Sequence, residues 1–309
     1  MKQKLGILVI AVFAAGSLLA ACASPAVEDQ SENTETLQQF KGDSGRLAFA
    51  AQTESGAPYD IYLMDLEFDR LIQITENASA DISPSLSRDG TWMVYSSDDK
   101  GTYDLYRMPL PPDEPQPLTN IKADETEPHI SPDGSMVIFQ TDAFGDFDIM
   151  ILNLLTSAQD RLTETDSQET QANWSPNGEQ IAYLSNQDGD FEIFTMRLDG
   201  SGKTQLTQND TYEASPVWSP DGEQIAFLSK RGSHFQIYVL DVLTGEEKQI
   251  TERPSTVHSP AWSPDGKFIA YIEEGSAGSQ INVLNIENEV TYLLLNDFRK
   301  YAGLAWIDS

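Results

Sequence analysis

The sequence lacks several features that would narrow its function at once. It contains a single cysteine, Cys22, among 309 residues, so an intramolecular disulfide and a cysteine-based metal site are excluded. It has 19 basic residues against 49 acidic ones and no basic run long enough to follow a phosphate backbone, so nucleic acid is not an expected partner. Beyond the first 21 residues the sequence also lacks the apolar periodicity of helices. This absence favours strands.

Motifs for catalysis are missing as well. No G-x-S-x-G occurs. The stretch at 199–204, Asp-Gly-Ser-Gly-Lys-Thr, ends like a phosphate-binding loop, but Arg197 stands where the first glycine belongs. The three histidines, His129, His234 and His258, stand where symmetry does not bring them together, and we interpret them as packing or surface residues. The sequence therefore predicts no catalytic residue, no resident metal and no cofactor.

The N-terminus has the pattern of an export signal. Lys2 and Lys4 precede an uncharged apolar run that ends in small residues at Ala21. Leu19-Ala20-Ala21-Cys22 resembles a bacterial lipobox, which implies a signal peptide over 1–21 and a lipid on Cys22. Residues 22–45 then form a flexible acidic tether. We expect a bacterial protein anchored by its lipid to a membrane of the cell envelope and facing away from the cytoplasm; which membrane stays open.

A strict repeat of 44 residues runs through the rest of the chain. A four-residue turn, Ser-Pro-Asp-Gly or a close variant, recurs without insertion, starting at Ser87, Ser131, Ser175, Ser219 and Ser263. Directly before each turn, and once more near the C-terminus, stands a large apolar residue: Leu86, Ile130, Trp174, Trp218, Trp262 and Trp306. A fixed period of this length decides the architecture before any local pattern does.

Each repeat holds four short segments rich in β-branched and aromatic residues, separated by Gly, Asp, Asn and Pro. The fourth segments run through an aligned series: Thr75, Thr119, Thr163, Thr207, Thr251 and Leu295. Four strands in about 40 to 45 residues are typical of a propeller blade. The Asp-Gly pair supplies the residue with positive φ for a tight hairpin between the first two strands. We therefore predict an all-β fold over residues 46–309, a six-bladed β-propeller of four-stranded blades.

The ends of the repeat predict how the ring closes. The first blade begins at a second strand, Leu47 to Ala51, and the chain ends with an inner strand, Tyr301 to Ile307. The C-terminal strand should therefore complete blade one.

The pattern resembles that of the TolB-like propellers, also described as WD-repeat-like. The resemblance is carried by Pro216-Val217-Trp218-Ser219-Pro220-Asp221-Gly222 with Ile225-Ala226-Phe227, and by Gly101-Thr102-Tyr103-Asp104-Leu105-Tyr106. It covers residues 46 to 309. Proteins with the TolB role carry an N-terminal α/β domain and bind a peptidoglycan-associated lipoprotein. Because only a tether is expected before this propeller, the resemblance implies the fold and not that role.

Two aligned acidic series carry the candidate sites. The first stands five positions before the inner-strand apolar residue and should lie at one mouth of the central channel: Asp81, Glu125, Glu169 and Glu213. Such carboxylates are able to attract Ca²⁺, a basic peptide terminus or a cationic ligand, or they are hydrated or bonded to backbone amides. The second series changes from acid to amide, which indicates a structural hydrogen-bonding role: Asp60, Asp104, Asp148, Glu192, Gln236 and Gln280.

These patterns favour a non-catalytic, lipid-anchored propeller that binds another envelope protein or a cell-wall component through its channel face and loops. The alternative is a cation-dependent enzyme or carbohydrate-binding protein that uses the acidic mouth, and a third reading is a structural member of an envelope complex. Paired carboxylates with raised pKa values would favour catalysis, whereas loops that differ between blades would favour binding.

Overall fold

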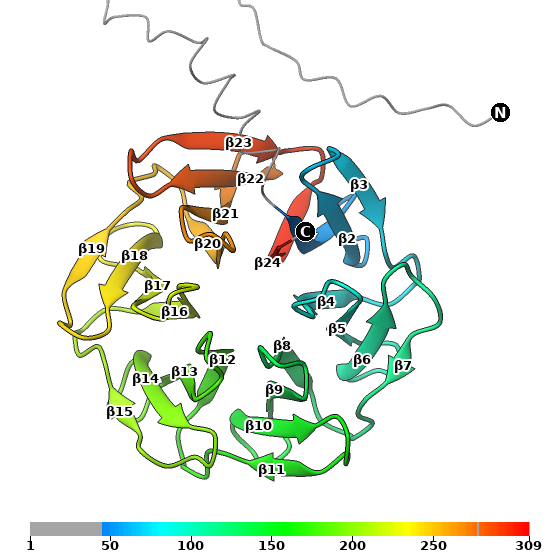
Figure 1. Ribbon diagram of the computed structural model, residues 1–309, viewed down its shortest axis with the longest axis horizontal. Coiled ribbons are helices and arrows are strands. Elements are labelled where there is room, and N and C mark those ends of the chain that lie inside the picture. The colour runs from blue at the N-terminus through cyan, green and yellow to red at the C-terminus, as the bar shows by residue number, and fades with distance from the viewer. Residues whose placement is uncertain (1–44, 277, 309) are drawn as a thin grey trace, which may run out of the picture.

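The computed structural model of the chain describes residues 45–276 and 278–308. The predicted signal peptide, Cys22 and most of the predicted tether lie outside the described residues. The described part contains 24 strands in six antiparallel four-stranded sheets, with no helix, and so none long and apolar enough to cross a membrane. The sheets stand radially about a central axis (Figure 1). The predicted six-bladed β-propeller is confirmed.

In each blade the four strands follow one another from the channel outward. Blade one has β24 (Lys300–Ile307), β1 (Arg46–Gln52), β2 (Asp60–Asp65) and β3 (Arg70–Gln73), and blade two has β4 (Asp81–Leu86), β5 (Trp92–Ser97), β6 (Asp104–Pro109) and β7 (Gln116–Pro117). Blade three has β8 (Glu125–Ile130), β9 (Met136–Thr141), β10 (Asp148–Asn153) and β11 (Gln159–Arg161), and blade four has β12 (Glu169–Trp174), β13 (Gln180–Ser185), β14 (Glu192–Arg197) and β15 (Thr204–Gln205). Blade five has β16 (Glu213–Trp218), β17 (Gln224–Ser229), β18 (Gln236–Asp241) and β19 (Glu247–Gln249), and blade six has β20 (Val257–Trp262), β21 (Phe268–Gly275), β22 (Gly278–Asn285) and β23 (Thr291–Leu295).

The ring closes as the sequence predicts. β24 pairs antiparallel with β1, which places Trp306 opposite Leu47 and Tyr301 opposite Ala51. In Figure 1 the last strand lies beside the first one at the inner edge of blade one. The Tyr301 ring is 2% exposed and packs edge-on against Phe49 with 5.5 Å between ring centroids. The two ends of the propeller therefore hold each other in one sheet.

The recurrent turn forms the hairpin between the first and second strands. Gly222 has φ 75°, and the Ser219 Oγ donates to Asp221 and accepts the amide of Gln224 at 2.9 Å. The tryptophan before the turn joins neighbouring blades, because the Nε1–H of Trp174 donates to the carbonyl of His129 at 2.9 Å. Trp262 does the same to Val217 at 3.2 Å. The turn and the tryptophan are thus structural.

The fourth strands are short, and in five blades a threonine beyond the strand end continues the hydrogen bonding to the third strand. The predicted fourth strands run through a threonine series, but β15 ends at Gln205, before Thr207. The Thr207 Oγ1 accepts the amide of Ile193 at 2.8 Å, and the equivalent bond recurs at Thr75, Thr119, Thr163 and Thr251. A side-chain hydroxyl therefore replaces the backbone partner of the third strand where the fourth strand ends.

A β-bulge recurs at one level of the inner strands. It places these residues at φ between 51° and 54°, in the left-handed region: Ser83, Glu127, Gln171, Ser215, Ser259 and Gly303. Proline follows the bulged residue at Pro84, Pro128, Pro216 and Pro260, which is tolerated because these strands are sheet edges. Bulges re-aim side chains.

Candidate binding site

The structure places each of the four predicted carboxylates at the first residue of an inner strand, where it is buried. Asp81 and Glu125 are 0% exposed, Glu169 is 1% exposed and Glu213 is 2% exposed. They lie at four separate blade junctions. At three of them the backbone amide of the inner-strand acid donates to the carbonyl of the residue just before the preceding member of the second acidic series: Asp81 to Tyr59 at 2.8 Å, Glu125 to Tyr103 at 2.7 Å and Glu169 to Phe147 at 2.7 Å. The four do not form one cluster.

The structure instead pairs the two acidic series across the junctions. The pairs are Asp60 with Asp81, Asp104 with Glu125, and Glu192 with Glu213. At the junction of Asp148 and Glu169, Asp148 instead forms an ion pair with Arg161, with 2.7 Å between Oδ2 and Nη2. The remaining two junctions have Gln236 with Val257 and Gln280 with Tyr301, so they contain no carboxylate pair. Members of a pair are 21 residues apart, a separation that no motif in the sequence marks.

Loops that connect consecutive blades cover these pairs. The amide of Ile121 donates to Asp104 Oδ1 at 3.2 Å, and the amide of Asn209 donates to Glu192 at 2.5 Å. In the next repeat the amide of Arg253 donates to the Gln236 side chain at 2.9 Å. An acid and an amide thus make the same bond, which confirms the structural role predicted for these members of the second series.

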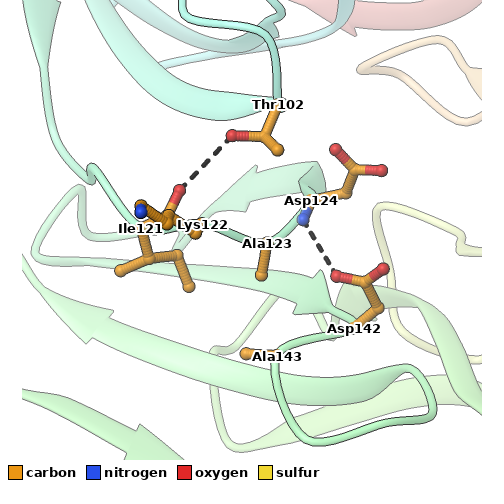
Figure 2. Close-up of a pocket in the computed structure, with 7 residues that line it drawn as sticks. All are labelled: Thr102, Ile121, Lys122, Ala123, Asp124, Asp142 and Ala143. Atoms are coloured by element: carbon orange, nitrogen blue, oxygen red, sulfur yellow. Dashed lines mark hydrogen bonds between the residues drawn. The ribbon is translucent and has the colours of Figure 1, made fainter.

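A surface hollow of about 430 Å³ lies beside the Asp104–Glu125 junction. Figure 2 shows its wall, in which Thr102 Oγ1 donates to the Ile121 carbonyl at 3.3 Å and the Asp124 amide donates to Asp142 at 2.9 Å. Asp124 also accepts the amide of Tyr103 at 3.0 Å. These hydrogen bonds hold the loops of the junction together. The polar groups of the hollow are therefore better explained by this structural role than by binding of a ligand.

Burial controls the electrostatics of the pairs. Desolvation raises the pKa of Glu125 to about 7, although the nearby Thr119 hydroxyl offsets part of this effect. Desolvation also raises the pKa of Asp81, against hydrogen bonds that include Asn77 Nδ2 at 2.8 Å. In the Glu192–Glu213 pair, burial raises the pKa of both carboxyls, and the two titrate together. Near neutral pH Glu125 is therefore partly protonated.

Raised pKa values in paired carboxylates would favour catalysis if a substrate reached them. Here the inner-strand acids are at most 2% exposed, so they have no open face. No group of three or more His, Cys, Asp or Glu side chains able to hold a metal occurs within 45–276 and 278–308. Ligand binding by Asp81, Glu125, Glu169 and Glu213, including binding of Ca²⁺, stays a prediction.

A second cavity opens at the opposite end of the channel, where the inner strands run into their hairpins. We call it the funnel: a cavity of about 410 Å³ whose wall includes Trp174, Trp218, Trp262 and Trp306, with prolines of the recurrent turns at its rim. Arg88 stands at the rim where the other turns have proline. The wall therefore combines large apolar side chains with polar groups, and a concave cavity of this size is the usual form of a binding site.

The channel below the funnel carries its carboxylate, imidazole and amide side chains on one side only. The polar side comes from β4, β8 and β12: Ser83, Ser85, Glu127, His129, Gln171 and Asn173. The equivalent residues of β16, β20 and β24 are small or apolar: Ser215, Val217, Ser259, Ala261, Gly303 and Ala305. Sequence reasoning missed this division. The available signal was the disagreement between repeats at positions that are inner-strand in all six blades.

Inter-blade hydrogen bonds fix the polar side. Ser83 Oγ donates to Glu127 at 3.1 Å, and Asn173 Nδ2 lies 3.4 Å from His129 Nδ1. Asn173 Oδ1 also accepts the amide of Trp218 at 3.3 Å. Burial lowers the pKa of His129 to about 4, so its imidazole is neutral at physiological pH. Of the three histidines, only His129 lines the funnel, while His258 contacts Glu274 at 3.0 Å.

One hydrogen-bond donor in the funnel wall is unsatisfied. The Nε1–H of Trp218, a side chain 8% exposed, has no acceptor among the described residues, whereas Trp174 and Trp262 donate to the preceding blade. A buried donor without a partner is destabilising by about 1–3 kcal/mol. A ligand that offers an oxygen here would remove that penalty.

The fold is a closed β-propeller of six blades, completed by the C-terminal strand. The funnel at one end of its channel is the candidate binding surface. The chain belongs to the TolB beta propeller domain family, whose sequence model matches residues 30–186 and 168–301. The comparison with curated proteins found no match.

Solved structures share the fold at low sequence identity. The TolB crystal structure from Acinetobacter baumannii has a TM-score of 0.77 and 20% identity, with 87% of this chain and 68% of that chain covered. The putative TolB from Agrobacterium tumefaciens has a TM-score of 0.68 and 20% identity, covering 86% and 100%. A chain of a nidogen/laminin complex has a TM-score of 0.68 and 11% identity, covering 85% and 98%. Identities this low establish the fold alone.

Proposed function

We propose that this protein is a non-catalytic binding module of the bacterial cell envelope, held by a lipid on Cys22, whose partner docks at the funnel. The partner is another envelope protein or a cell-wall component. The funnel carries this proposal, because it joins an apolar wall to a one-sided set of polar groups on a rigid ring.

Two further observations support a protein partner. The family is that of the TolB propeller, and a similar propeller fold occurs in a nidogen/laminin complex, where it is part of a protein assembly. The channel also differs from blade to blade, although the scaffold repeats every 44 residues. Selection for folding alone would favour the same residue in every blade, so the differences favour recognition.

Membrane attachment is tested by replacing the lipid acceptor. Cys22→Ser removes the sulfur to which the lipid would be joined, and stable anchoring needs more than one acyl chain. We expect the protein to move from the membrane fraction to the soluble fraction, measured by immunoblot after ultracentrifugation of lysed cells. Ser24→Ala in the same tether is the control and should stay with the membrane. A Cys22→Ser protein that sediments with the membrane contradicts the lipid anchor.

Docking at the funnel is tested by site-specific photocrosslinking in intact cells. A benzophenone amino acid at Arg88, on the funnel rim, should yield discrete crosslinked species that mass spectrometry identifies. The control position is Leu243, which is 94% exposed in the hairpin between β18 and β19 on an outer edge. Equal crosslinking from both positions, or none from the rim, refutes docking at the funnel.

A further inference from the structure

The Glu127 carboxylate is the acidic group of the channel. It lies on β8 at the bulge, is half-buried, and accepts a hydrogen bond from Ser83 Oγ at 3.1 Å. The other residues at this level are Ser83, Gln171, Ser215, Ser259 and Gly303, so among described residues the ring contains no basic side chain. His258 contacts Ser259 but also lies 3.0 Å from Glu274, and its pKa is lowered by burial.

This carboxylate lacks a counter-ion. Its desolvation raises the pKa of Glu127, and the single hydroxyl of Ser83 compensates only in part. Carboxylates removed from water are ordinarily paired with a cation or satisfied by several donors. A cationic group that binds Glu127 would supply the missing partner, which the described residues do not provide.

Glu127 lies close below the funnel. His129 lines the funnel, and Glu127 precedes it by two residues on β8 across the bulge, a separation of at most about 7 Å along the chain. The equivalent residues of the opposite inner strands, Ser215, Ser259 and Gly303, have small side chains or none. The aliphatic stem of a lysine or arginine spans this depth while its charged head reaches the polar groups.

We propose that the channel receives a lysine or arginine side chain of a partner polypeptide, with its charged head on the Glu127 carboxylate and its stem between the tryptophans of the funnel. A backbone carbonyl of the same polypeptide accepts the unsatisfied Nε1–H of Trp218. The inference rests on the proposed function in taking the partner to be a polypeptide, and it adds the group by which that polypeptide is recognised. The acidic surface of the protein, with a formal charge of −30, favours the approach of such a segment.

The test uses the mature full chain in detergent and three blocked pentapeptides, acetyl-Gly-Gly-X-Gly-Gly-amide, in which X is lysine, arginine or norleucine. Norleucine keeps the stem of lysine and lacks its charge. Binding is followed by tryptophan fluorescence, since four tryptophans line the funnel, and by calorimetry. We expect the lysine and arginine peptides to bind at least tenfold more tightly than the norleucine peptide.

The matched variants remove the same charge inside and outside the channel. Glu127→Gln should reduce binding of the lysine peptide to the level of norleucine, whereas Glu246→Gln, in the exposed hairpin between β18 and β19 at the outer edge, should leave it unchanged. Thermal unfolding checks that both variants are folded. Equal binding of lysine and norleucine peptides by the unmodified protein overturns the inference, and so does an unaltered affinity in Glu127→Gln.

The two proposals fail separately. If Arg88 crosslinks a partner in cells while the three peptides bind alike, docking at the funnel stands and recognition of a cationic side chain is refuted. If the lysine peptide is preferred but the rim yields no crosslink in cells, the channel chemistry stands and the proposed docking is refuted.

Discussion

Deletion of residues 300–309 is expected to abolish cooperative folding of the propeller. The deletion removes β24, so β1 loses its inner partner and becomes an exposed edge at the channel. It also removes Tyr301, which is 2% exposed and packs with Phe49 and Phe298, and Trp306 of the same strand. A fully buried large side chain contributes about 1.5–3 kcal/mol, and a domain has only about 5–15 kcal/mol in total. The measurement is unfolding by heat or denaturant, followed by circular dichroism.

Rescue and a graded variant separate loss of the strand from a general defect. A synthetic peptide of residues 298–309, added to the truncated chain, should restore a cooperative transition by pairing with β1. Tyr301→Ala should destabilise the intact chain by about 3–5 kcal/mol, as truncation of a buried aromatic side chain does. A truncated chain that unfolds cooperatively, with a midpoint close to that of the full chain, contradicts closure by β24.

The buried carboxylate pairs are expected to make the propeller less stable as the pH rises through neutrality. The pKa of Glu125 is about 7 in the folded protein against 4.5 for an ordinary glutamate, so the folded state binds this proton more tightly. The stabilisation is fully present below pH 4.5 and is lost as the pH rises through 7. A difference of this size corresponds to about 3 kcal/mol. The Glu192–Glu213 pair shifts in the same direction and adds to the loss.

The effect is isolated by comparing variants across pH. Glu125→Gln keeps the shape of the side chain and removes the titration, so it should exceed the unmodified protein in unfolding free energy by up to about 3 kcal/mol at pH 9 and match it near pH 4. Glu223→Gln removes the same charge from an exposed hairpin and should change stability by less than about 0.5 kcal/mol at every pH. Denaturant unfolding at several pH values supplies the data. If the difference in unfolding free energy between Glu125→Gln and the unmodified protein does not vary with pH, this would falsify the raised pKa of Glu125.

The sequence was a good guide to the scaffold because the evidence for it is repeated. Five turns at identical spacings of 44 residues, each with a tryptophan or aliphatic residue before it, predict the blades and the hairpins, and the sixth such residue, Trp306, predicts the C-terminal closure. The threonines were placed in the fourth strands, whereas Thr207 lies beyond the end of β15 and bonds through its hydroxyl. The error arises because threonine suits both positions. It is common within strands, and its hydroxyl can also accept a hydrogen bond from the third strand when it lies beyond the strand end.

The candidate site was predicted less well. The sequence placed Asp81 and its equivalents correctly at the start of the inner strands but grouped them with one another, whereas Asp81, Glu125 and Glu213 are each paired with a member of the second series. His129 was interpreted as a packing or surface residue, and it lies in the funnel wall beside Asn173. Neither contact follows from the repeat, because both depend on how one blade packs on the next.

By itself the sequence determined which positions are equivalent. A period of 44 residues states that Glu127, Gln171 and Ser215 occupy the same place in successive blades, and that the last strand has no blade of its own. Only the tertiary structure decided which equivalent positions meet: carboxylates 21 residues apart come together under a loop, and three consecutive inner strands make one side of the channel polar. The physical reason is that periodicity fixes the path of the chain within a blade, whereas burial, pKa and access to the channel depend on the contact between blades.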